Sequence, residues 1–128
     1  MVKDLSRVFL LVKDLARSIQ FYREFFERAP ASEDARHARF DLGQVSLTIH
    51  EDLTQEETAY WRVGPVPEQR GWGVYLTLAT DDLDANYKKL GRLGAEIVSR
   101  PQVTPWRTRM LIARDPDGYL LEICQRDN

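Results

Sequence analysis

The spacing of apolar residues predicts a strand followed by a helix at the start of the chain. Residues 5–12 form a short apolar stretch that is typical of a strand. Between residues 15 and about 28, apolar side chains recur at helical spacing and define one broad buried face. Asp14 suits the helix N-cap, and Pro30 stops the helix because it cannot continue one.

A hairpin and a long connection are expected next. Segments 36–42 and 45–51 are predicted strands joined near Gly43 and Gln44. The small, polar stretch 31–35 is either an edge strand or a loop. Residues 53–72 are polar, contain Gly and Pro, and carry two of the three tryptophans. A connection of this length is unusual inside a compact domain and is often functional.

The same pattern then begins again. Residues 73–80 are a predicted strand, Asp82 a predicted N-cap and 83–93 a predicted helix. At a fixed offset of 68 residues, Asp14 aligns with Asp82 and the flanking apolar positions align as well. Each half is therefore predicted to be β-α-β-β-β, and a repeat of this length indicates a fold built from two similar modules. The remaining strands are expected at 95–99, 108–114 and 119–124.

One carboxylate stands in the last of these strands. Asp115-Pro116-Asp117-Gly118 has the composition of a tight turn, because Pro presets φ and Gly accepts positive φ. Glu122 follows inside an otherwise apolar run. Such a carboxylate is costly to bury without a cation, a metal or hydrogen bonds. Glu122 is therefore the first candidate functional residue.

Composition narrows the class of protein. The 128 residues are 43% apolar and 30% charged, as in a soluble globular domain. We expect one domain, 1–128, with a first module at about 1–52, a connection at 53–72 and a second module at about 73–128. A net charge of −2 favours neither nucleic acid nor a membrane as partner, and no apolar run is long enough to cross a bilayer. A single cysteine excludes an internal disulfide, so a cytoplasmic location is expected.

The repeat and two local signatures together resemble the vicinal oxygen chelate superfamily, which includes glyoxalases, bleomycin-resistance proteins and dioxygenases. The signatures are the strand-to-helix segment from Val12 to Tyr22 and the closing segment from Asp115 to Glu122. The resemblance implies an α+β fold in which two βαβββ modules form curved mixed sheets around a cleft, with the helices outside.

The metal-dependent members of that superfamily place His or Glu ligands on four strands. By resemblance, those positions fall on Arg7, Ser46, Tyr75 and Glu122. Arginine cannot release its proton to bind a metal, and Ser and Tyr are poor ligands for the divalent ions concerned. One carboxylate does not make a metal site. We therefore expect no metal and no cofactor, as in the bleomycin-resistance-like members, and interpret His37 and His50 as surface or hairpin histidines.

Strand alternation predicts which side chains face a ligand. The face that holds Glu122 is more polar than the opposite, aliphatic face, which should pack on the helices. Arg7 is expected to pair with Glu122, directly or through a ligand, and Tyr75 could donate to the same carboxylate. Trp106 and Arg109 are included among the predicted ligand-binding residues because a loop aromatic can stack on a flat ligand and an arginine can bind an anion. The predicted ligand-binding residues are Arg7, Phe9, Ser46, Thr48, Tyr75, Thr77, Trp106, Arg109 and Glu122.

Three functions remain open. The first is a metal-independent binding protein that sequesters or carries a small, aromatic molecule, and the resemblance adds that it would be a homodimer. The second is a glyoxalase-like lyase, an isomerase or a dioxygenase, in which Glu122 is an acid/base or a metal ligand. The third is an interaction module without a small ligand. Lost metal ligands on an intact scaffold favour the first, so we expect a binding protein in preference to an enzyme.

Overall fold

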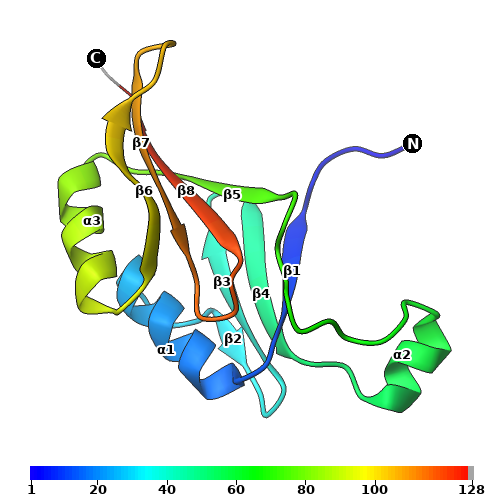
Figure 1. Ribbon diagram of the computed structural model, residues 1–128. Coiled ribbons are helices and arrows are strands. Elements are labelled where there is room, and N and C mark those ends of the chain that lie inside the picture. Colours follow the sequence, from blue (N-terminus) through cyan, green and yellow to red (C-terminus); the bar gives the residue numbers. More distant parts are fainter. Residues whose placement is uncertain (127–128) are drawn as a thin grey trace. The chain divides into compact units, whose positions relative to one another are not determined.

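The computed structural model describes residues 1–126 and divides them into two compact units, one within 1–68 and the other from Gln69 onward (Figure 1). Each unit holds one four-stranded mixed sheet. The predicted α+β fold with two βαβββ modules is confirmed. No helix among the described residues is long and apolar enough to span a bilayer.

Unit 1 contains four strands and two helices. In chain order these are β1 Arg7–Val12, α1 Leu15–Phe26, β2 Ser32–Glu33, β3 His37–Leu42, β4 Val45–Glu51 and α2 Gln55–Trp61. The strand order is β1-β4-β3-β2, in which β1 and β4 are parallel and the other pairs are antiparallel.

Unit 2 repeats this arrangement. Its elements are β5 Tyr75–Ala79, α3 Leu83–Arg92, β6 Glu96–Val103, β7 Thr108–Arg114 and β8 Leu120–Arg126. The strand order β5-β8-β7-β6 places its first strand parallel to its last, as in unit 1. The internal repeat predicted from the sequence is therefore a repeat of topology.

One helix covers one face of each sheet. In unit 1, α1 packs on the sheet through Phe21, Tyr22 and Phe25, which are buried together with Ser18. In unit 2, α3 packs on the sheet through Leu83 and Leu90. Asp14 and Asp82 cap the two helices, as predicted, by accepting hydrogen bonds from the backbone of the first turn. Both cores lie between a helix and one sheet face, and the opposite faces carry the candidate site residues.

Several predicted boundaries were wrong, each for a local reason. Helix α1 ends at Phe26, before Pro30, because Glu27 takes the left-handed conformation with φ 54°. Strand β6 runs through Pro101 to Val103. It lies at the edge of its sheet and its register shifts twice, and proline is tolerated at edges and bulges.

Helix α2 was missed in the connection. Its polar sequence buries none of its own residues, so no apolar period reveals it. A capping box starts it: the Thr54 hydroxyl accepts from Glu57 N–H (3.2 Å), and the Glu57 carboxylate accepts from Thr54 N–H (2.9 Å). The pattern Thr-x-x-Glu was the signal in the sequence that could have found it.

Candidate functional site

The polar face of the unit 1 sheet is built by register between β1 and β4. Arg7 lies opposite Ser46, Phe9 opposite Thr48 and Leu11 opposite His50. The alternate residues of the same strands form the buried aliphatic face toward α1: they are Leu10, Val12, Leu47 and Ile49. The predicted segregation of polar and aliphatic faces is therefore confirmed for this sheet.

Unit 2 has the corresponding face. Tyr75 lies opposite Leu120 and Thr77 opposite Glu122, and Leu121 and Ile123 are buried on the other side. The hydroxyl that contacts Glu122 belongs to Thr77, whose Oγ1 donates to Oε1 at 3.3 Å. Tyr75, which could donate to the same carboxylate, has Leu120 as its strand partner, two residues from Glu122, and that contact stays a prediction.

The repeat assigns Glu122 a counterpart in unit 1. Phe9 and Thr77 are related by the 68-residue offset, and their partners across the parallel strand pair are Thr48 and Glu122. Thr48, not Ser46, is therefore the position in β4 equivalent to Glu122. The Ser46 hydroxyl already donates a hydrogen bond to Asp41 Oδ1 at 2.9 Å.

Thr48 is the unusual member of this face. Its side chain is 3% exposed, and Oγ1 is a buried polar atom for which the described residues provide no hydrogen-bond partner. A buried hydroxyl without a partner costs about 1–3 kcal/mol in lost hydration. This position therefore favours an additional hydrogen-bonding group that the chain itself does not supply.

Beside Thr48, a row of flat groups crosses three strands of unit 1. The Arg7 guanidinium carbon lies 5.4 Å from the ring centroid of Phe9, within the range of a cation–π contact. Phe9, which is 46% exposed, lies 5.3 Å from the His50 ring, and His50 lies 6.4 Å from the His37 ring. The row combines one cation with three aromatic rings on the polar face.

Two predicted residues lie apart from these faces. Met110 lies opposite Cys124 and so is on the same face as Glu122. Arg109 precedes Met110 and therefore points to the other, helix side of the sheet, where its Nη2 pairs with Asp84 Oδ1 of α3 at 3.1 Å. Trp106 is 71% exposed in the turn between β6 and β7. Arg109 does not share the face of Glu122, so its predicted contact with a ligand has no geometric support.

Three further exposed aromatic residues belong to the connection. Trp61 and Trp72 are 64% and 85% exposed, so neither seals the core of its unit. Tyr60 is 76% exposed, and its ring packs edge-on against that of Trp61 at 5.1 Å. Their side chains are therefore accessible to a ligand or to a second subunit.

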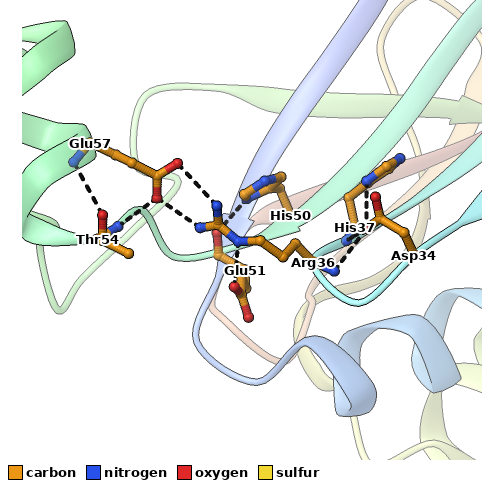
Figure 2. A network of polar contacts seen from close by, with 7 residues as sticks. All are labelled: Asp34, Arg36, His37, His50, Glu51, Thr54 and Glu57. Carbon is orange, nitrogen blue, oxygen red and sulfur yellow. Dashed lines mark hydrogen bonds and ion pairs between the residues drawn. The ribbon is translucent and has the colours of Figure 1, made fainter.

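Arg36 is a residue that the sequence reading did not single out (Figure 2). Its guanidinium donates to the Glu51 carboxylate at 2.6 Å and to both oxygens of Glu57 at 2.7 and 3.1 Å. The bond from Arg36, followed by the bond from Thr54 N–H, lowers the pKa of Glu57 to about 2. Glu57 and then Glu51 raise the pKa of Arg36 above its ordinary value. The polar helix α2 is therefore held to the β3–β4 hairpin by charge.

The donor set does not fit the metal site that the resemblance implies. Arg7, Ser46, Tyr75 and Glu122 provide one metal-binding carboxylate, and the register-corrected position Thr48 adds none. Across the described part of the chain, no three His, Cys, Asp or Glu side chains gather to hold a metal ion. Arg7 and Glu122 belong to different units, so their pairing stays a prediction.

Comparison with known proteins decides the family. Residues 4–123 match the model of the Glyoxalase/Bleomycin resistance protein/Dioxygenase superfamily. The chain belongs to this superfamily. The resemblance seen in the sequence is confirmed.

Individual relatives are distant. Metallothiol transferase FosB of Shouchella clausii is 25% identical over 96% of this chain and 80% of its own length. A superfamily enzyme of Burkholderia phytofirmans has the same fold with a TM-score of 0.82 at 18% identity, over 96% of this chain and 98% of that chain. The fosfomycin resistance protein FosX of Mesorhizobium loti reaches 0.72 at 19% identity, over 99% and 95%.

Proposed function

We propose that the protein binds a small planar molecule without a metal ion, on the polar face of the unit 1 sheet, which carries Thr48. The observation that carries this proposal is the buried Thr48 hydroxyl without a partner, at the repeat position equivalent to Glu122. A ligand polar atom at Thr48 Oγ1 would supply the missing hydrogen bond. Ligand binding would thereby offset the free-energy cost of the buried, unpaired Thr48 hydroxyl.

The neighbours of Thr48 indicate the chemistry of the ligand. Phe9 offers a half-exposed ring next to Thr48, and the Arg7 guanidinium lies over that ring. Aromatic rings bind flat apolar surfaces, and a guanidinium binds a carboxylate or a similar anion. A planar aromatic molecule with one anionic or carbonyl group suits this set. In unit 2, the polar Thr77–Glu122 pair is a separate candidate for binding a hydroxyl or amine group.

The test is a binding screen with planar aromatic compounds, followed by tryptophan emission and calorimetry. Thr48→Val is expected to weaken binding about tenfold, the equivalent of one hydrogen bond, while Thr48→Ser retains it. Trp106→Ala should reduce the emission response. In the free protein, Thr48→Val should leave the free energy of unfolding unchanged or raise it, because it removes the unpaired hydroxyl. A ligand that binds Thr48→Val as tightly as wild type, or a screen without any ligand, would contradict the proposal.

A fosfomycin-resistance-type or glyoxalase-like enzyme is the second candidate, favoured by the similarity to FosB and FosX. It would use Glu122 as an acid/base or as a metal ligand. Elemental analysis of the purified protein and assays on fosfomycin and on 2-oxoaldehydes distinguish the two candidates. Turnover that is lost in Glu122→Gln, or a stoichiometric metal lost in that variant, would replace the metal-independent proposal.

A further inference from the structure

His37 and His50 form a cross-strand pair at the end of the β3–β4 hairpin. The Glu51 N–H donates to the Arg36 carbonyl at 2.9 Å, so the next pair along, His37–His50, is a non-hydrogen-bonded pair. Side chains approach most closely at such pairs, with Cβ atoms about 4.5–5.5 Å apart. The two rings are nearly parallel, at 10°, with centroids 6.4 Å apart.

Each ring is held at the same nitrogen (Figure 2). His50 Nδ1 lies 2.6 Å from the Glu51 carbonyl oxygen, which can only accept, so Nδ1 carries the proton. His37 Nδ1 lies 2.9 Å from Asp34 Oδ1. Asp34 Oδ1 also accepts from Arg36 N–H at 2.8 Å and from His37 N–H at 2.9 Å, so it serves as an acceptor for the His37 ring as well. In both neutral rings the lone pair is therefore on Nε2.

This arrangement is the one that metal-binding histidines have. A ligating imidazole almost always donates its other N–H to a carboxylate or a backbone carbonyl, which fixes the tautomer and the direction of the ring. Here Asp34 and the Glu51 carbonyl are already in those places. The His37 side chain is 34% exposed and His50 is partly buried beside Phe9, so an ion can reach the pair from solvent.

We propose that His37 and His50 bind one divalent transition metal ion through their two Nε2 atoms, with water in the remaining positions. Metal–nitrogen bonds of about 2.0–2.1 Å require the two Nε2 atoms to come within about 4 Å. At a non-hydrogen-bonded pair, with Cβ atoms about 4.5–5.5 Å apart, small adjustments of both side chains can bring the Nε2 atoms within that distance. Cu²⁺ should bind most tightly and Zn²⁺ more weakly, by the usual order for nitrogen sites. The site uses neither Glu122 nor Thr48, so it does not depend on the proposed function.

The experiment is titration of chelator-treated full-length protein with Cu²⁺ and with Zn²⁺ at pH 7.5, followed by calorimetry and, for Cu²⁺, by electron paramagnetic resonance. One ion per chain is expected, with a spectrum that shows two nitrogen ligands in wild type. His37→Ala and His50→Ala should each weaken Cu²⁺ binding at least about tenfold, as the loss of one of two ligands requires. Cys124→Ser is the control and should bind like wild type.

Two results would overturn the inference. One is a spectrum with fewer than two nitrogen ligands in wild type, which is decisive even if the alanine variants fold poorly. The other is unchanged affinity in the His37→Ala/His50→Ala double variant with native circular dichroism. Because ligand binding is tested through Thr48, failure of the metal site leaves the proposed function standing, and the reverse holds as well.

Discussion

Arg70 and Asp117 form an ion pair that is almost closed to solvent, although 47 positions separate them in the chain. Arg70 Nη1 lies 3.5 Å from Asp117 Oδ2, and the two side chains are only 6% and 4% exposed. Arg70 precedes β5, and Asp117 lies in the turn before β8. The pair therefore fastens the segment that enters unit 2 to the turn that leads to Glu122.

Breaking this pair should destabilise unit 2 strongly. Asp117→Asn or Arg70→Met removes one member of a buried ion pair, which costs about 3–5 kcal/mol. Chemical denaturation monitored by circular dichroism measures the loss. The matched control is Arg109→Met, which removes the more exposed pair with Asp84 and should cost no more than about 1 kcal/mol. Equal losses at the two sites would show that burial of the Arg70 pair has no energetic consequence.

Gly71 lies beside Arg70 and is constrained by space as well as by its backbone. Its φ is +85°, and an added Cβ would lie 2.7 Å from the Tyr119 Cα. Gly64 has a similar φ of +81° with nothing within 4 Å of such a Cβ. Gly64→Ala should therefore cost only the left-handed strain of about 1–2 kcal/mol, and Gly71→Ala about 1–3 kcal/mol more. Thermal unfolding of the two variants gives the difference, and a difference of zero would contradict the contact.

The attachment of α2 to the hairpin should depend on pH through Glu57. Since the pKa of Glu57 is lowered to about 2, chiefly by Arg36, its stabilisation is complete above the ordinary value of 4.5. The stabilisation is lost as the pH falls from 4.5 through 2. In Arg36→Met, NMR titration should show the pKa of Glu57 rising toward 4.5, and amide exchange in α2 should accelerate. Arg39→Met is the control, because Arg39 pairs with Asp41 and should leave Glu57 unchanged.

We predict that the protein forms a homodimer in solution. It comes from the resemblance to dimeric superfamily members and is consistent with the exposed Tyr60, Trp61 and Trp72 of the connection. Sedimentation at micromolar concentration should give about twice the chain mass of 14.9 kDa. A mass near one chain would refute the dimer, and Trp61→Ser tests whether the connection takes part in it.

Much of the fold followed from periods that are local in the sequence. The helical spacing after Asp14 and Asp82, the alternation in the strands and the 68-residue repeat predicted both modules and the family. Alternation also predicted which face of each sheet is polar, because neighbouring side chains of a strand point to opposite faces whatever its partner is. The helix and strand periods are encoded by residues a few positions apart, and the repeat by the return of the same periods 68 residues later.

Tertiary structure decided everything that depends on which strands are neighbours. Register between β1 and β4 made Thr48 the counterpart of Glu122, where the sequence had suggested Ser46. The position of Arg109 opposite Asp84 and the burial of Arg70 with Asp117 likewise required elements distant in the chain to meet. The sequence by itself determined the modules, the polar faces and the place of Glu122. Only the folded chain determined the partners of those side chains, because no local period carries information about contacts across tens of residues.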